Sequence, residues 1–241
     1  MSLYSVWGPP QSGKTTAAID LATALSLHGL SVCLISGEPY SELSARMGIR
    51  IEPSRSIAAV GNSSEALRHI VCPASELLFV LAAPCVYDAF GEGLSAEQEK
   101  ALLRQAMSSF DVVLVDCASH GSRTLDAWAL RLADRVLFLT GGSTASALWC
   151  GAFARAVDAV RDRIVPVCME TAPDFDYANL FRLEALTPKY RLPHIPDAAA
   201  VQAERKSLYS AGGRAGRSYA AGLDALCSLL TGISTTGGAG R

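Results

Sequence analysis

Short runs of apolar, often β-branched residues alternate along this chain with longer segments in which apolar residues recur every three or four positions. The apolar runs predict strands, and their lack of polar–apolar alternation indicates that both faces of the sheet are covered. Regular alternation of strands and helices predicts an α/β fold with a doubly wound, mostly parallel sheet. The strands are expected at 3–7, 31–36, 76–83, 110–116, 135–140 and 163–169.

Segments with helical periodicity separate these strands. Ser95 and Gln98 have the spacing of a capping box, which predicts that a helix begins there. The Gly-, Ser- and Thr-rich residues 232–241 predict a disordered tail, so a single domain is expected over 1–231. Helices are expected at 14–28, 95–107, 122–133, 145–161, 198–209 and 215–230.

Composition narrows the class of protein. The chain has 241 residues, of which 50% are hydrophobic, and its formal net charge is −2, which gives no sign of a nucleic-acid or acidic-membrane partner. No apolar run reaches the roughly 18 residues that a membrane-spanning helix needs, and the N-terminus lacks the features of a signal peptide. The seven cysteines include no C-x-x-C pair, which is typical of buried thiols in a reducing cytoplasm.

The stretch "GPPQSGKT" has the spacing G-x-x-x-x-G-K-T and lies between a predicted strand and a predicted helix. This context suits a phosphate-binding loop, because N–H groups at a helix N-terminus point towards an anion. Lys14 would lie along the β- and γ-phosphates, Thr15 would bind Mg²⁺, and Thr16 would reach the α-phosphate. The alternative is a Gly-Pro turn before an ordinary helix. The other loop residues expected to bind the nucleotide are Gly8, Gln11, Ser12 and Gly13.

A phosphate loop that binds Mg²⁺ needs a second, acidic position. The stretch "FDVVLVDC" places Asp116 at the carboxyl end of an apolar strand, where a carboxylate can hold the ion together with Thr15. Many buried strands end in Asp, so capping of the next helix is the alternative for Asp116.

Beyond these two motifs, nearly the whole chain resembles the MinD/ParA group of P-loop ATPases, which carries a deviant Walker A motif. The resemblance implies ATP and Mg²⁺ as cofactors and an ATP-dependent homodimer. Glu38 stands where the group has the Asp that orients the attacking water, so Glu38 and Lys14 are the implied catalytic residues. The group stacks adenine near a segment similar to the one containing Pro196 and Asp197. The matching stretches are "GKTTAAIDLATALSLHGLSVCLISGEP", "FDVVLVDCAS", "LADRVLFLT" and "LPHIPDAAAVQAERKSLY".

The chain departs from this group inside the phosphate loop. Pro9 stands where the group has a lysine that touches the partner's phosphates, and Pro10 and Gln11 replace two glycines. Proline carries no charge and donates no N–H, so we expect ATP binding with slow or impaired hydrolysis. Arg123 is the candidate replacement for the lysine, with a solvated charge at a helix end as its alternative.

Basic residues indicate neither DNA nor membrane as the partner. Arg205, Lys206, Arg214 and Arg217 stand beside an acidic residue and predict a solvated face rather than a DNA-binding patch. The last helix has few basic residues around its apolar face, which favours packing on the core over membrane binding.

Other proteins are therefore the expected partners. The departures in the Walker A motif resemble those of the CpaE/TadZ pilus-assembly localisation ATPases, which implies a positioning or assembly factor for a pilus or secretion machine. The alternatives are a partition-type ATPase, a nucleotide-bound scaffold without turnover, and a metabolic P-loop kinase or ligase. A metabolic enzyme needs a second polar cluster, for which "SHGSR" (119–123) is the candidate, with His120 more typical of a surface loop.

Overall fold

The computed structural model describes residues 1–60, 67–84, 93–120, 124–183 and 185–233. Its strands form one eight-stranded sheet in the order β3-β4-β2-β5-β1-β6-β7-β8. Neighbouring strands pair in parallel, except β3 with β4, which confirms the predicted mostly parallel α/β sheet. The strands are β1 (Ser2–Trp7), β2 (Val32–Ser36), β3 (Cys72–Pro73), β4 (Leu78–Leu81), β5 (Val112–Asp116), β6 (Arg135–Thr140), β7 (Ile164–Met169) and β8 (Tyr190–Leu192).

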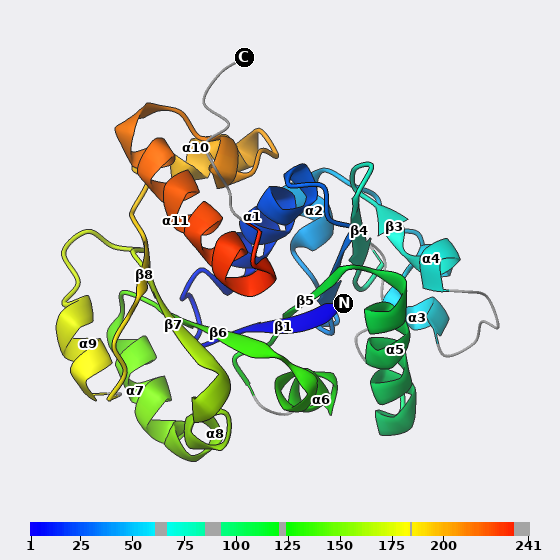
Figure 1. Ribbon diagram of the computed structural model, residues 1–241, viewed down its shortest axis with the longest axis horizontal. Coiled ribbons are helices and arrows are strands. Elements are labelled where there is room, and N and C mark those ends of the chain that lie inside the picture. Colours follow the sequence, from blue (N-terminus) through cyan, green and yellow to red (C-terminus); the bar gives the residue numbers. More distant parts are fainter. Residues whose placement is uncertain (61–66, 85–92, 121–123, 184, 234–241) are drawn as a thin grey trace.

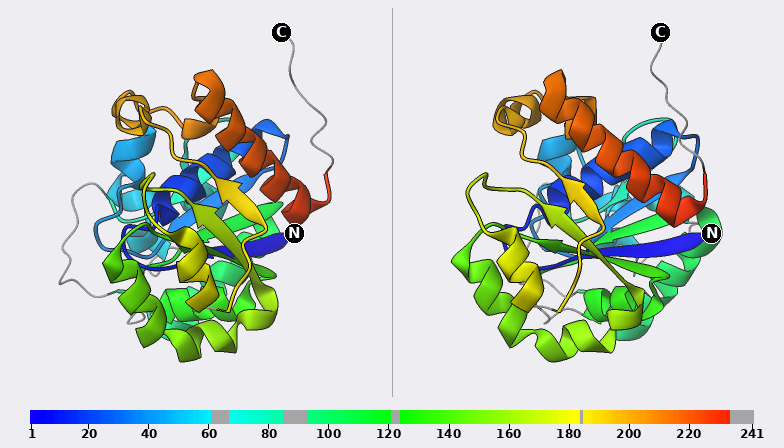
Figure 2. Two further views of the ribbon diagram at one scale, coloured as in Figure 1. Left: turned by 90° about the vertical axis from the view of Figure 1, so that its left-hand side faces the viewer. Right: turned by 60° about the vertical axis from the view of Figure 1, so that its left-hand side comes forward.

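Helices cover both faces of the sheet (Figure 1). α1 and α11 bury their apolar side chains against one face, and α5, α6 and α7 pack on the other face. Figure 2 looks towards the β7–β8 edge and shows α11 on one side of the sheet, with α7 and α8 on the other. The helices are α1 (Lys14–Leu27), α2 (Leu43–Met47), α3 (Ile57–Val60), α4 (Leu67–Ile70), α5 (Ala96–Ser109), α6 (Thr124–Leu132), α7 (Thr144–Ala152), α8 (Ala154–Ala159), α9 (Tyr177–Leu183), α10 (Ala198–Ala203) and α11 (Gly213–Thr231).

The predicted strands and most predicted helices lie within a few residues of their expected positions, and the capping box of Ser95 and Gln98 is confirmed. Two helix predictions were too long. The helix expected at 145–161 is interrupted at Phe153, and the one expected at 198–209 ends at Ala203, because Arg205 has a φ of 59° that a right-handed helix does not allow. The short elements β3, β8, α2 and α9 were not predicted.

The last helix packs on the core, as predicted. α11 buries Tyr219, Leu223, Leu226 and Leu230 in the cluster that also contains the apolar face of α1. Within the described residues, no helix has the length and apolar character to cross a membrane. The six described cysteines are all buried and form no disulfide. The predicted tail lies outside the described residues beyond Ile233.

The phosphate loop leaves the sheet at the carboxyl end of β1. β1 lies between β5 and β6 in the sheet. The strands β2 to β5 lie on one side of β1, and β6 to β8 lie on the other side. Ligands bind at such a topological switch point. Gly8, the first loop residue, has a φ of 152°, and a Cβ at this position would lie 2.1 Å from the carbonyl oxygen of Leu139 in β6. Only glycine therefore fits where the loop begins.

We expect Gly8→Ala to lower the free energy of unfolding by about 3 kcal/mol or more, because neither backbone can move without breaking sheet hydrogen bonds. Urea unfolding measures this loss. Gly151→Ala is the matched control: a Cβ there meets no atom within 4 Å, and alanine in helix α7 should add about 0.5 to 1 kcal/mol. Equal stabilities for the two variants would contradict the close contact.

Candidate functional site

The loop from Gly8 to Gly13 ends with the N-terminus of α1 open to a ligand. Gly13 is the N-cap residue, with φ 81° and ψ 16°, and no side chain caps the helix. The first N–H groups of a helix have no partner within it, so these groups are available to bind an anion. Gln11 also has a left-handed φ, of 58°. The loop thus has the backbone of a phosphate cradle.

Lys14 is held close to this loop. Its Nζ donates hydrogen bonds to the carbonyl oxygen of Pro9 at 3.0 Å and to Ser119 Oγ at 2.6 Å. Ser119 is fixed in turn by Trp149, whose Nε1 donates to the Ser119 carbonyl at 2.7 Å. Burial lowers the pKa of Lys14, while the negative charges of Asp116 and Glu38 act against that change. A phosphate group at the loop would pair directly with this half-buried ammonium.

Thr15 and Asp116, the residues expected to bind Mg²⁺, are in hydrogen-bond contact. The Thr15 hydroxyl donates to Asp116 Oδ2 at 2.8 Å, and Asp116 Oδ1 is buried with no hydrogen-bond partner among the described residues. Burial raises the pKa of Asp116 to about 6, and the bond from Thr15 and the charge of Lys14 oppose that rise. Hydroxyl and carboxylate oxygens are ligands that Mg²⁺ prefers, so these residues fit a Mg²⁺ ion that also binds nucleotide phosphates.

Glu38 follows β2 and faces the same site. Its charge acts on both Lys14 and Asp116, and its backbone N–H donates to Ser36 Oγ at 3.4 Å. The carboxylate is therefore near Lys14 and Asp116. Arg123, the candidate replacement cation, lies outside the described residues.

The two prolines of the loop differ from Gln11 in burial. Pro9 is buried and Pro10 is half-buried, whereas Gln11 is exposed. Pro9 contributes a carbonyl acceptor for Lys14 but no positive charge. The other predicted loop residue, Ser12, is fully buried, and its hydroxyl has no hydrogen-bond partner within the described part of the chain.

A pocket of about 170 Å³ lies beside the loop. Its apolar walls and its position next to Thr16 suit the base of a nucleotide whose phosphates lie on the loop. Pro196 and Asp197 do not line it: both are exposed, and the three residues before them form that wall instead. The residues around it include Gly13, Thr16, Met169, Thr171, His194 and Ile195.

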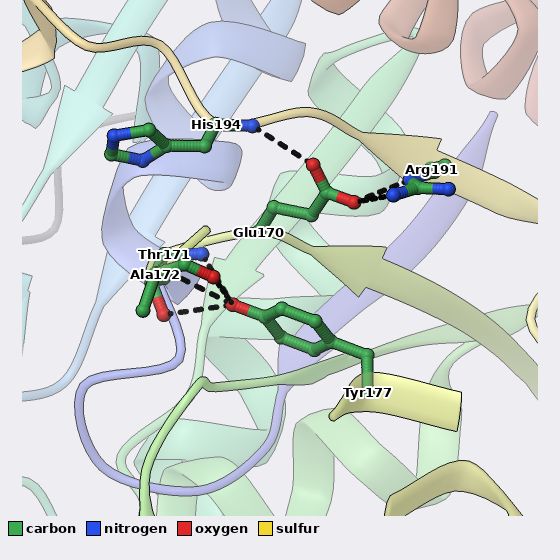
Figure 3. Close-up of polar contacts among 6 residues, drawn as sticks. All are labelled: Glu170, Thr171, Ala172, Tyr177, Arg191 and His194. Atoms are coloured by element: carbon green, nitrogen blue, oxygen red, sulfur yellow. Dashed lines mark hydrogen bonds and ion pairs between the residues drawn. The ribbon is translucent and has the colours of Figure 1, made fainter. Parts of the chain in front are cut away.

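Two groups of polar contacts hold the walls of this pocket together (Figure 3). The Glu170 carboxylate accepts hydrogen bonds from the Arg191 guanidinium and, at 3.2 Å, from the His194 N–H, which ties the ends of β7 and β8 together. The Tyr177 hydroxyl accepts from the N–H groups of Thr171 and Ala172, at 2.8 and 3.0 Å. Sequence reasoning missed these residues, because no local motif marks contacts between separate segments.

Sequence reasoning also missed Arg46. This residue of α2 donates from its guanidinium to Thr16 Oγ1 at 2.9 Å. In the sequence, Arg46 is a single basic residue a few positions after the Glu38 segment. Many surface helices contain such a residue, so this pattern does not mark a site.

No protein-family model and no curated protein matches this sequence. Solved structures do match it. The septum site-determining protein MinD of Pyrococcus horikoshii, in complex with Mg-ADP, has a TM-score of 0.78 at 12% identity, covering 95% of this chain and 97% of that chain. The fold is that of the MinD/ParA P-loop ATPases.

Two further structures agree with this fold. In the MinC:MinD cell division complex of Aquifex aeolicus, the matched chain has a TM-score of 0.74 at 16% identity, covering 93% of this chain and 95% of that one. A putative plasmid partition protein of Borrelia burgdorferi, bound to AMPPNP, gives 0.72 at 14% identity, covering 95% and 99%. At these identities the likeness shows the shared fold.

The buried carboxyl of Asp116 predicts an unusual pH dependence of stability without nucleotide or Mg²⁺. Because its pKa is raised from 3.8 to about 6, the carboxyl favours the folded state at low pH and loses that contribution as the pH rises through 6. At pH 8 the buried charge costs on the order of 3 kcal/mol. We expect Asp116→Asn to stabilise the protein by up to about this amount at pH 8 and hardly at pH 4.

Denaturant unfolding at both pH values tests this expectation. Asp111→Asn is the control, because hydrogen bonds from the side chain and backbone of Ser31 lower the pKa of that exposed carboxyl. Its replacement should destabilise the protein slightly at pH 8, the opposite direction. Lower stability of Asp116→Asn at pH 8 would contradict the buried-charge account.

Proposed function

We propose that this protein is a MinD/ParA-like ATP-binding switch, a slow ATPase that forms a homodimer with ATP and Mg²⁺ and acts by binding other proteins. The observation that carries this proposal is the pairing of Thr15 with Asp116 beside an open phosphate loop. The buried Asp116 oxygen without a partner supports a role for these residues in holding Mg²⁺. Lys14 would bind the phosphates, and Glu38 would orient the attacking water.

We expect slow hydrolysis because the loop has no cation at position 9. In P-loop enzymes, a cation brought to the transferred phosphate supplies roughly a thousandfold or more in rate. Here position 9 is a buried proline, and its neighbour Pro10 fixes the backbone. Lys14, Mg²⁺ and Glu38 would therefore act without a lysine from the partner subunit.

The surface supports a protein partner more than DNA. Lys206 pairs with Glu204 at 2.7 Å, and the side chain of Arg205 packs over Gly48. Arg205 and Lys206 are exposed, as are Arg214 and Arg217 on α11, and these four cations beside Glu204 are few for a phosphate-binding patch. A partner from a pilus or secretion machine is the proposal, and the MinC:MinD complex is a case in which this fold assembles with another protein.

A partition-type ATPase is the second candidate, favoured by the likeness to the Borrelia plasmid partition protein. A metabolic kinase or ligase has less support. Its substrate cluster was expected around His120, which is exposed, and residues 121–123 of that stretch lie outside the described residues.

We expect Mg²⁺ and ATP to convert the protein into a dimer, because nucleotides that face one another across a two-fold axis would bridge the subunits. Light scattering with and without Mg-ATP measures this change, with Glu38→Ala used to suppress turnover. Lys14→Ala is the control, since it removes the charge that binds the phosphates and should remain monomeric. A monomer in both conditions would overturn the switch, and a stable complex with duplex DNA would favour the partition alternative.

We expect the dimer to hydrolyse ATP at well below about one turnover per minute, a rate typical of a P-loop without an added cation. Pro9→Lys alone should change little, because Pro10 and Gln11 keep the loop in its present shape. The triple change Pro9→Lys, Pro10→Gly and Gln11→Gly should raise the rate. A steady-state phosphate-release assay decides, and brisk turnover of the unchanged protein would show that another residue supplies the cation.

A further inference from the structure

Arg46 is a mostly buried cation beside the phosphate loop. Only 19% of its side chain is exposed, yet its one ion pair among the described residues is with Glu42 at 3.7 Å, and that partner is 71% exposed. An ion pair this long with a solvated carboxylate at the N-cap of the helix contributes little. A guanidinium has five donors, and the hydrogen bond to Thr16 Oγ1 at 2.9 Å uses one of them.

The buried acids near Arg46 do not bind it directly. Asp20 is already satisfied, because it accepts hydrogen bonds from the Ser207 hydroxyl, the Leu208 N–H and the Tyr219 hydroxyl. Asp116 accepts from Thr15. Arg46 therefore brings a positive charge to this site whose one ion pair among the described residues is the long contact with the solvated Glu42 carboxylate. A charge removed from water is stable when an anion pairs with it closely.

The path of a bound nucleotide places its α-phosphate at this cation. The terminal phosphates would lie on the N–H groups at the start of α1, and the base would lie in the pocket that Thr16 helps to line. The α-phosphate connects these two parts, so it must pass Thr16, whose hydroxyl Arg46 already contacts.

We propose that Arg46 binds the α-phosphate of the nucleotide, together with Thr16 and from the same chain. This inference rests on the proposed function, because it requires that a nucleotide binds at the loop. A guanidinium forms bidentate hydrogen bonds with phosphate oxygens, which a single ammonium does not match. Arg46 also joins α2 to the nucleotide, and so couples phosphate binding to the segment that carries Glu38.

A purely structural role predicts something different. If Arg46 only fastens α2 to α1, then Arg46→Ala lowers the melting temperature without nucleotide and leaves nucleotide affinity intact once the protein is folded. If it binds the α-phosphate, the affinity falls for every nucleotide that carries this phosphate on the loop.

The experiment is calorimetric titration of Mg-ATP and Mg-ADP into the unchanged protein and its variants. Arg46→Ala should weaken both nucleotides by a similar factor, about tenfold to a hundredfold, the value of a charge-assisted hydrogen bond. Arg46→Lys should give an intermediate loss, and it serves if the alanine variant folds poorly. Arg50→Ala, which removes an 81% exposed arginine paired with Glu52, should leave both affinities unchanged.

Each remaining outcome is decisive. Unchanged affinities in folded Arg46→Ala and Arg46→Lys would overturn the inference while leaving the proposed function in place. A loss for ATP alone would place Arg46 at the γ-phosphate and overturn the assignment to the α-phosphate. No binding of either nucleotide to the unchanged protein would overturn the proposed function itself.

Discussion

The close approach of the phosphate loop to β6 is the contact on which the site depends. A Cβ at Gly8 would lie 2.1 Å from the Leu139 carbonyl, and one at Gly141 would lie 2.8 Å from Ser12 Cα. Two glycines that directly follow β1 and β6 thus let two backbones touch, and the loop is held against the end of the sheet. Because the loop is fixed, Thr15 meets Asp116 and Lys14 reaches Ser119.

This rigid site is built at a cost in stability. Asp116 is buried and Lys14 is half-buried, and burial disfavours the charged form of each. Gln11 adopts a left-handed backbone that glycine would adopt more easily. The two prolines act in the opposite direction, because a fixed φ reduces the conformational freedom of the unfolded chain. A loop with this balance suits firm binding of phosphate more than the small rearrangements of rapid turnover.

Local pattern was enough to predict the sheet and the loop, but not the rest of the site. Buried parallel strands appear as uninterrupted apolar runs, and the phosphate loop combines a fixed spacing with a strand before it and a helix after it. β8 has only three residues, and α2 only five, so neither carries a periodic signal. Arg46 belongs to the site because it contacts Thr16, which lies 30 positions earlier in the chain. No local motif reveals a contact of this kind.

The segments around the loop suggest how nucleotide binding, even with slow hydrolysis, would act on the surface of the protein. Side chains that surround the predicted nucleotide position come from α1, α2, the ends of β5 and β7, and the segment between β8 and α10. A nucleotide bound there would touch elements from both halves of the sheet, so its binding free energy would be spread over contacts between them. Nucleotide binding would then change the relative stability of conformations that present different surfaces, even if the γ-phosphate is never cleaved. For a protein that acts by presenting a surface to a partner, the lifetime of the bound nucleotide matters more than the rate of its hydrolysis, and under the proposed function a loop without a cation at position 9 would lengthen that lifetime.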